Sequence, residues 1–220
     1  MVLKIGHRGA KGYAPENTLF SFKKALDCNV DIVNFDVRSS RCKKLVVFRH
    51  SYLNSKLVSR SSFRRLRSLD VGGNKPMPTL KEVFDFGSNS VVYLISVHDR
   101  RSVRRVVSLI NRYVKKYGWS YDNFMIESSN RSRLRLVRRL SKKISLVYSS
   151  VLPFGVFSFM KKYSIGTIIV HHQFLGRIFI RKAHNRNLKV FVAIVNSKPE
   201  IEYFKSSGVD GIVSDYPDII

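Results

Sequence analysis

The sequence predicts an α/β fold of the TIM type, a (β/α)8 barrel, with a doubly wound parallel sheet as the alternative. Three observations lead to this prediction. Short apolar runs rich in Val, Ile and Phe recur along the chain, and such runs suit strands buried on both faces of a parallel sheet. Amphipathic helical patterns lie between several of these runs. The length of 220 residues is usual for one barrel, so we expect residues 1–220 to form a single domain.

Nine segments are expected to form strands, because each is a short run of mainly apolar residues. In chain order they are residues 3–5, 32–37, 45–48, 91–97, 124–126, 144–148, 166–170, 190–195 and 211–213. A barrel of this type has eight strands, so one of the nine should lie outside it.

Local signals mark the ends of several helices. Thr79 with Glu82, and Ser197 with Glu200, have the spacing of a capping box, which predicts a helix start at each place. Gly208 can then end the second helix in the left-handed conformation. Between these helices, residues 100–116 and 131–143 alternate basic and apolar residues at helical spacing, and we interpret them as solvent-facing amphipathic helices.

The charge of the chain favours anionic partners. Forty Lys and Arg against fifteen Asp and Glu give a formal net charge of +25. An acidic membrane surface, phosphate esters and nucleic acid are therefore all candidate partners. No nucleic-acid-binding motif accompanies the charge, so nucleic acid would be bound without sequence specificity.

The remaining composition favours an intracellular protein, in the cytoplasm. Cys28 and Cys42 are the only cysteines, and the first residues lack the pattern of a secretion signal. The longest uncharged run, residues 144–160, is interrupted by Ser, Pro and Gly and is shorter than the roughly 20 apolar residues of a transmembrane helix. We therefore expect no transmembrane span.

The segment from Ile5 to Leu19, IGHRGAKGYAPENTL, predicts an anion-binding site. It places a histidine, an arginine, a glycine-containing loop and a helix start directly after the first strand. Other polar residues follow later strands and would meet it at the carboxyl face of the barrel. These residues are Asp36, Arg49, His50, His98, Asn196 and Asp215.

The same segment closely resembles the opening motif of the glycerophosphodiester phosphodiesterase family. Further segments resemble that family in the same order, namely NFDV at 34–37, LVVFRH at 45–50, MPTLKEVF at 77–84, VAIVN at 192–196 and GVDGIVSDYP at 208–217. The resemblance implies a TIM-type barrel with a short insertion after the third strand. It also implies hydrolysis of glycerophosphodiesters to glycerol phosphate and an alcohol, with two histidines and a divalent cation, Ca²⁺ or Mg²⁺.

The residues that would hold this cation are altered. The resemblance implies three carboxylates, and the corresponding positions are Asn34, Asp36 and Ser96, so two of the three are neutral. The affinity of such a site depends on the number of its negative ligands. We therefore expect the cation to bind weakly or not at all.

The catalytic and phosphate-binding residues are altered less evenly. His7 matches the first catalytic histidine, whereas Arg49 stands at the second and His50 follows it. Because side chains alternate along a strand, His50 would enter the site only through a local bulge. Arg8, Lys11 and Arg49 are the candidate phosphate-binding residues, since cationic side chains pair with phosphate oxygens.

Several other polar residues have secondary roles in this interpretation. We expect Glu16 to stabilise the helix start that follows it. His98 stands at a lysine position of the family and is a secondary candidate for binding phosphate. The histidines at 171, 172 and 184 lie outside the motifs, and we expect them at surface or core positions.

Together these residues predict a glycerophosphodiester phosphodiesterase-like protein that is impaired or inactive in catalysis. It would still bind a small phosphodiester or a phospholipid-derived ligand. One alternative is an active metal-dependent phosphodiesterase that uses His7, Asp36 and His50. The other is a basic scaffold protein whose outer helices bind nucleic acid or acidic lipid.

Overall fold

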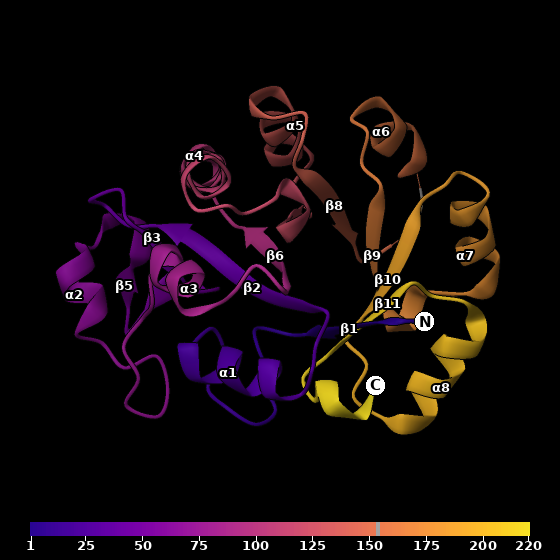
Figure 1. Cartoon of the computed structure of the whole chain (residues 1–220), viewed down its shortest axis with the longest axis horizontal. Helices are drawn as coiled ribbons and strands as arrows, with labels where there is room; N and C mark the ends of the chain where they lie inside the picture. Colours follow the sequence, from indigo (N-terminus) through magenta and orange to yellow (C-terminus); the bar gives the residue numbers. More distant parts are fainter. Residues whose placement is uncertain (153–154) are drawn as a thin grey trace.

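In the computed structural model, which describes residues 1–152 and 155–220, a ring of parallel strands is surrounded by helices (Figure 1). The strands of the ring are β1 (Leu3–Gly6), β2 (Ile32–Ser39), β6 (Val92–Val97), β7 (Phe124–Ser128), β8 (Ser145–Ser150), β9 (Thr167–His171), β10 (Lys189–Ala193) and β11 (Gly211–Ser214). Each pairs in parallel with the next, and β1 closes the ring by pairing with both β11 and β2. The TIM-type barrel is confirmed, and the doubly wound sheet is excluded.

The ninth predicted strand lies outside the barrel, as the strand count required. This strand, β3 (Leu45–Val47), pairs antiparallel with the end of β2. The insertion follows it and comprises the hairpin β4 (Tyr52–Leu53) and β5 (Lys56–Leu57), the 3-10 turn η1 (Val58–Arg60) and the short helix α2 (Phe63–Arg67). Figure 1 shows these elements together on one side of the barrel. The short insertion after the third strand is therefore confirmed.

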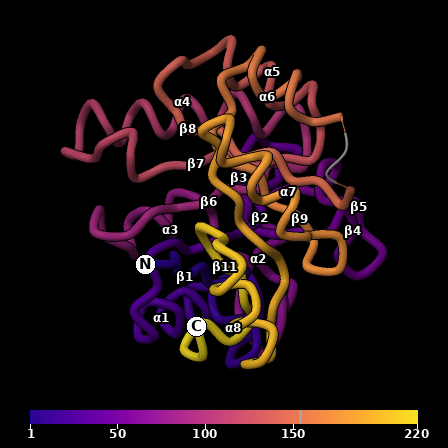
Figure 2. The backbone as a smooth tube through the Cα atoms, turned by 90° about the vertical axis from the view of Figure 1, so that its right-hand side faces the viewer, coloured from indigo at the N-terminus to yellow at the C-terminus, as the bar shows by residue number. Residues whose placement is uncertain are grey.

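The other helices cover the barrel and return the chain between its strands. They are α1 (Leu19–Asp27), α3 (Leu80–Phe86), α4 (Arg100–Lys116), α5 (Arg131–Leu140), α6 (Phe157–Lys162), α7 (Arg177–His184) and α8 (Lys198–Ser207). Further 3-10 turns are η2 (Tyr121–Asn123), η3 (His172–Phe174) and η4 (Pro217–Ile219). The two ends of the chain lie near each other, which follows from the pairing of β1 with β11 (Figure 2).

The predicted helix ends form in part as the sequence indicates. The capping box at Thr79 forms with Glu82, and Gly208 ends α8 at a φ of 85°. At Ser197 the helix begins as predicted, but the side chain makes no cap hydrogen bond. The Ser197 hydroxyl instead donates to Glu200 Oε2 at 2.6 Å, and the other oxygen of that carboxylate lies 3.0 Å from His172 Nδ1. The second capping box therefore does not form, because Glu200 bonds side chains instead.

Two apolar layers hold the barrel together. The larger lies between the strands and the helices and includes the alternate residues Val33, Phe35 and Val37 of β2. The smaller fills the lower part of the barrel interior and consists of Ile5, Ile32, Leu94, Val147, Phe191 and Val213. Because strand residues alternate between faces, the residues that follow this inner layer by two positions also point inward. That relation positions the site described below.

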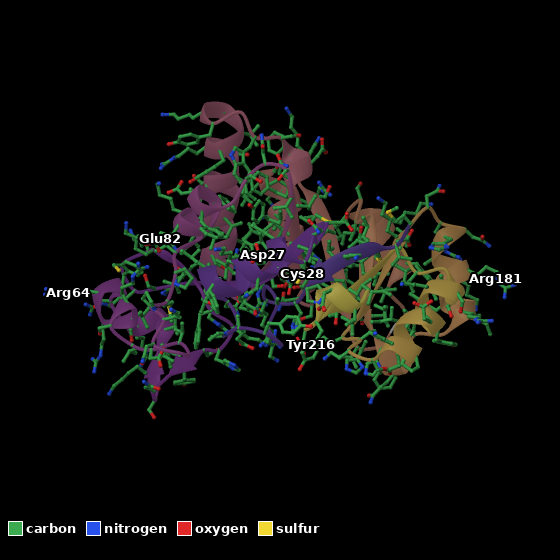
Figure 3. All side chains as sticks on the ribbon, turned by 60° about the horizontal axis from the view of Figure 1, so that its bottom comes forward. Asp27, Cys28, Arg64, Glu82, Arg181 and Tyr216 are labelled. Atoms are coloured by element: carbon green, nitrogen blue, oxygen red, sulfur yellow. The ribbon has the colours of Figure 1, made fainter. Side chains whose placement is uncertain are left out.

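Most basic residues lie on the outer surface. In Figure 3, Arg64 of α2 and Arg181 of α7 extend into solvent at opposite ends of the molecule. Residues 144–160, the longest uncharged run, contribute to β8 and α6, with Pro153 and Phe154 outside the described residues. Across the described ranges, no helix has the length and apolar character needed to span a bilayer.

Candidate functional site

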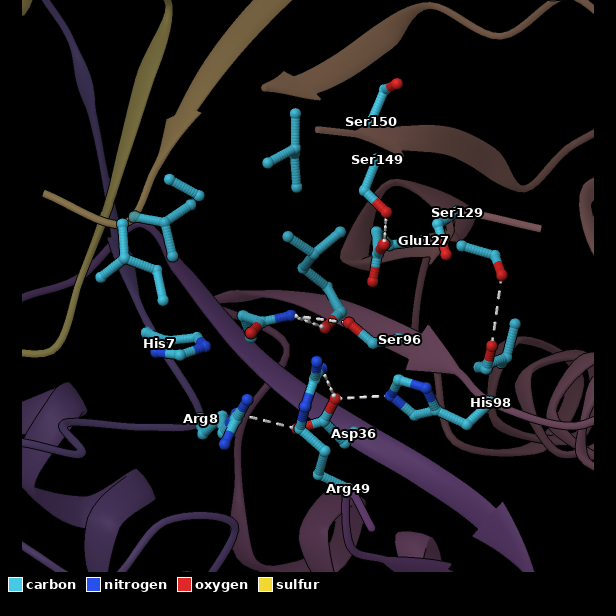
Figure 4. A pocket seen from close by; sticks show the side chains of 18 of the residues that line it. His7, Arg8, Asp36, Arg49, Ser96, His98, Glu127, Ser129, Ser149 and Ser150 are labelled. Carbon is cyan, nitrogen blue, oxygen red and sulfur yellow. Dashed lines mark hydrogen bonds and ion pairs between the residues drawn. The ribbon is translucent and has the colours of Figure 1, made fainter. Parts of the chain in front are cut away.

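A cavity of about 400 Å³ opens at the carboxyl ends of the barrel strands (Figure 4). Its lining combines cationic side chains, hydroxyls and two carboxylates above an apolar floor. The ionisable residues among them are His7, Arg8, Asp36, Arg49, His98, Glu127, Arg133 and His171. The composition suits a ligand that carries negative charge.

Strand alternation delivers these side chains from the barrel wall. On β2, Ile32 belongs to the apolar interior, and Asn34 and Asp36 follow it at intervals of two. On β6, Leu94 belongs to that interior, and Ser96 follows on the same face. The polar cavity is thus the upper layer of the same interior whose lower layer is apolar.

Asp36 is the charged centre of the site. The residue is 2% exposed, and its Oδ1 lies 2.6 Å from His98 Nε2 and 3.4 Å from Arg49 Nη1. Its Oδ2 lies 3.1 Å from Arg8 Nε and accepts a hydrogen bond of 3.1 Å from Asn17 Nδ2. Burial alone would raise the pKa of Asp36, but His98, Arg8 and Asn17 outweigh it and hold that pKa well below its usual range. The carboxylate is therefore ionised and surrounded by cationic groups.

Asn34 and Ser96 bond to each other beside this carboxylate. Asn34 Nδ2 donates to Ser96 Oγ at 3.1 Å and to the Leu94 carbonyl at 3.2 Å. Both side chains are buried, with exposures of 8% and 5%. The two neutral replacements thus satisfy part of their hydrogen bonding within the protein and add no charge to the site.

His7 is oriented by a carboxylate at the other side of the cavity. Its Nδ1 lies 2.6 Å from Asp215 Oδ1, and Asn196 Nδ2 donates to Asp215 Oδ2 at 2.9 Å. Burial would raise the pKa of Asp215, but the bonds from His7 and Asn196 lower it below its usual value. The ionised carboxylate favours the proton on Nδ1, which leaves Nε2 of His7 available to a ligand.

Arg8 is fixed by two carboxylates. Its Nη1 donates to both oxygens of Glu16, at 2.7 and 2.6 Å, while Nε faces Asp36 without a well-directed hydrogen bond. Glu16 lies before Thr18, the N-cap of α1, and so is not in the first turn of that helix. Its carboxylate pairs with Arg8 and does not stabilise the helix start as expected. Lys11 Nζ lies 3.6 Å from Glu16 Oε2 and does not line the cavity.

The backbone at Arg8 is held in a costly conformation. Its φ of 50° lies in the left-handed region, which costs a non-glycine residue about 1 to 2 kcal/mol. The Arg8 carbonyl accepts from Asn17 N at 3.1 Å and from Ser21 Oγ at 3.0 Å, so the loop is fixed on both sides. Gly9 follows at a φ of 88°, and a Cβ there would lie 2.5 Å from Ser21 Oγ. Such strain in a closely bonded loop is typical of functional sites.

Arg49 and His50 point to different places. Arg49 lines the cavity and reaches Asp36, whereas His50 is exposed, packs edge-on against Phe48 at 5.8 Å and does not line the cavity. β3 ends at Val47, and its ladder with β2 is regular, so no bulge turns His50 inward. Arg49, and not His50, therefore occupies the position that the resemblance assigns to the second catalytic histidine.

The cavity also contains residues that sequence motifs did not indicate. Glu127 of β7 accepts a short hydrogen bond from Ser149 of β8, and His171 lies at the end of β9. Burial and then the neighbouring His172 lower the pKa of His171. The alternation of side chains along a strand could have located both residues. Met125 of β7 and Ile169 of β9 face the barrel interior, and Glu127 and His171 each follow one of them by two positions.

The protein is thus a TIM-type barrel with a cavity at its strand ends, where arginine and histidine side chains surround an acidic residue, which is the place of the active site in barrel enzymes. Residues 7–219 match the Glycerophosphoryl diester phosphodiesterase family, and the chain belongs to that family.

Individual relatives agree along almost the whole chain. The YhdW protein of Bacillus subtilis is 28% identical, covering 98% of this chain and 95% of its own. A glycerophosphodiester phosphodiesterase of Caldanaerobacter subterraneus is 25% identical, covering 99% and 96%. The fold matches the structure of an Oleispira antarctica phosphodiesterase in complex with its product sn-glycerol-3-phosphate, with a TM-score of 0.90, 22% identity and coverage of 97% and 93%.

The cation that family membership implies does not fit these residues. Of the three implied ligands only Asp36 carries charge, and both of its oxygens face cationic groups. Within residues 1–152 and 155–220, no three His, Cys, Asp or Glu side chains are grouped to hold a metal ion. A divalent cation beside Asp36 would have to displace His98 and Arg49 from its carboxylate and would be repelled by the two guanidinium groups of Arg8 and Arg49.

Proposed function

We propose that this chain binds a small phosphate ester of the glycerophosphodiester type in the cavity and does not hydrolyse it by metal-dependent catalysis. The observation that carries the proposal is the contact of Asp36 with Arg8 and Arg49, which places fixed positive charge where the family's cation would act, while His98 occupies a further oxygen contact. Phosphate would then be held by arginine, while Nε2 of His7, with the proton on Nδ1, would accept a hydrogen bond from a hydroxyl of the ligand. We place the protein inside the cell, consistent with the free thiols of Cys28 and Cys42.

Arg49 is the residue best suited to contact a ligand directly. Its side chain is 46% exposed, compared with 11% for Arg8, and its contact with Asp36 is long at 3.4 Å. A guanidinium with free donors can bind two phosphate oxygens at once. Arg8 would contribute mainly fixed charge beneath the ligand.

The test is a titration of glycerol 3-phosphate by calorimetry, in EDTA and again with Mg²⁺ or Ca²⁺. We expect binding without metal, and a loss of about tenfold or more in affinity in Arg49→Met, because hydrogen bonds to charged groups contribute about 1.5–3 kcal/mol. Arg41→Met is the matched control, since Arg41 is exposed in the turn before β3 and does not line the cavity. In parallel, glycerophosphocholine should remain intact with either metal.

Binding that required Ca²⁺ or Mg²⁺, or metal-dependent turnover abolished by His7→Ala, would overturn this proposal. An absence of any ligand binding would overturn it as well.

A second candidate function is slow hydrolysis without metal, which the presence of His171 in the cavity favours. His7 would accept a proton from the water that attacks phosphorus, and His171, in place of the exposed His50, would donate a proton to the alcohol oxygen as its bond to phosphorus breaks. Turnover in EDTA that is lost in both His7→Ala and His171→Ala, and kept in His50→Ala, would support this function.

A further inference from the structure

A group of exposed apolar side chains lies beside the cavity. Val151 and Leu152 follow β8, Phe174 ends η3 after β9, and Ile178 lies in the first turn of α7. They are 61%, 51%, 46% and 67% exposed, in that order, and Val151 also lines the cavity. β8 and β9 are paired, so both loops emerge at the same end of the barrel. We call these four residues the apolar rim. Grouped apolar side chains in water indicate a binding surface.

Arginines occupy the first turns of three helices that begin at this end of the barrel. They are Arg100 and Arg101 in α4, Arg131 and Arg133 in α5, and Arg177 in α7, and no acidic residue occupies any of these first turns. Within the described ranges, the arginines that pair with carboxylates are Arg8, Arg49 and Arg67, so none of these five does. Positive charge at a helix N-terminus opposes the helix dipole. Asp99 caps α4, and Arg131, Arg133 and Arg177 also donate to oxygens of the protein, but their positive charge is not paired with a carboxylate and suits an anionic partner.

The side of the barrel that carries the apolar rim is uniformly basic in sequence. Residues 128–199 contain no Asp or Glu and fifteen Lys or Arg. This stretch includes α5, α6 and α7, which follow one another around the barrel (Figure 1). A surface of this charge complements an anionic partner over a wide area.

We propose that the apolar rim and the arginines around it dock on an anionic lipid bilayer, so that the cavity opens toward the membrane surface. The apolar side chains would enter the headgroup region while the arginines contact lipid phosphates. The combination favours a bilayer over nucleic acid, because nucleic acid would engage the arginines and leave Leu152 and Ile178 in water. The apolar rim and these arginines do not include Asp36 or the residues that contact it, Arg8, Arg49 and His98. Docking therefore does not depend on whether the cavity turns over a substrate.

The test is sedimentation of the full chain with vesicles of phosphatidylcholine, with and without phosphatidylglycerol. We expect binding to the anionic vesicles that weakens as NaCl rises. The variant Leu152→Ser with Phe174→Ser and Ile178→Ser, and the variant Arg100→Gln with Arg101→Gln, should each bind roughly tenfold more weakly or worse.

Two control variants make the same chemical changes at the opposite end of the barrel. Lys115→Gln with Lys116→Gln removes two charges from the other end of α4, and Phe86→Ser with Tyr117→Ser removes exposed aromatic rings at the ends of α3 and α4. Both should bind vesicles as the unaltered chain does. His7→Ala should also bind them normally, which separates docking from ligand binding in the cavity. Circular dichroism would confirm that each variant is folded.

Three results would overturn the proposal. The first is no sedimentation with phosphatidylglycerol vesicles. The second is an equal loss of binding in the control variants, which would make the attraction a property of total charge. The third is unchanged vesicle binding in the apolar variant together with tight oligonucleotide binding through Arg100 and Arg101, which would indicate a polyanion surface instead.

Discussion

At the scale of single residues, the site carries a different charge from the ligand set that the sequence resemblance implies. Two expected carboxylates are the neutral pair Asn34 and Ser96, which bond to each other. Arg8 and Arg49 place positive charge at the two oxygens of Asp36, and His98 contacts Oδ1 as well. The buried carboxylate therefore has counter-charges supplied by the chain itself.

The ion pairs of Asp36 predict how stability depends on pH. The folded-state pKa is depressed, and the unfolded value is about 3.9. The stabilisation is therefore fully present above about pH 4 and is lost as the pH falls below that value toward the folded pKa. We expect urea unfolding to give a free energy of unfolding that decreases on acidification through this window, and Asp36→Asn to show a smaller decrease.

The same variant tests the cluster at neutral pH. Asp36→Asn removes the buried carboxylate that Arg8 Nε, Arg49 and His98 contact, while Glu16 still pairs with Arg8, so the variant should lower the free energy of unfolding at pH 7 by about 3 to 5 kcal/mol. Asp122→Asn is the control, because Asp122 is exposed and should change stability little. A cost at pH 7 equal to that of the control would show that the cluster contributes no net stability.

At the scale of elements, the sequence predicted strands well, because their apolar pattern repeats over several residues. It predicted helix caps less well, because a single side-chain contact determines whether a cap forms. Apolar runs located the nine strands of the main sheet, because burial leaves a strong signal, but not the two-residue strands β4 and β5, which are partly exposed. The capping box at Thr79 formed, while the identical spacing at Ser197 did not, since Glu200 found His172 from a distant loop. Glu127 and His171 were missed because motif comparison, unlike strand alternation, does not mark them.

Helix α4 offers a test of the cost of its arginines. Arg100→Gln with Arg101→Gln and Lys115→Gln with Lys116→Gln each remove two exposed charges from one helix, at its opposite ends. Each variant therefore relieves overall charge repulsion by a similar amount, and this contribution cancels when their free energies of unfolding are compared. The first should be more stable than the second by about 0.5 kcal/mol or more, because the helix dipole disfavours cations at the N-terminus and favours them at the C-terminus. Chemical denaturation would measure the difference, and a zero or inverted difference would contradict this account of α4.

At the scale of the whole molecule, opposing demands meet in one barrel. The closed ring of strands and its two apolar layers supply the stability that allows a strained Arg8 loop and a buried charge cluster at one end. The same fold carries a net charge of +25. That charge favours anionic ligands and surfaces at long range, but it also works against the compact state by self-repulsion. The fold could be predicted from the sequence. The balance between attraction of anions and self-repulsion could not, because it depends on which Lys and Arg side chains pair with carboxylates in the folded structure.

Self-repulsion predicts that salt stabilises this protein. Raising NaCl from about 0.01 M to about 0.3 M shortens the screening length from about 30 Å to under 10 Å, which weakens repulsion among exposed Lys and Arg. The buried contacts of Asp36 are screened much less, so the net effect should be a higher midpoint of thermal unfolding, measured by calorimetry. Choline chloride at matched ionic strength should give the same curve, since no specific ion is involved. Lys115→Gln with Lys116→Gln should flatten the salt dependence by removing two of the repelling charges. A midpoint that falls as salt increases would mean that attractive pairs outweigh repulsion even at +25.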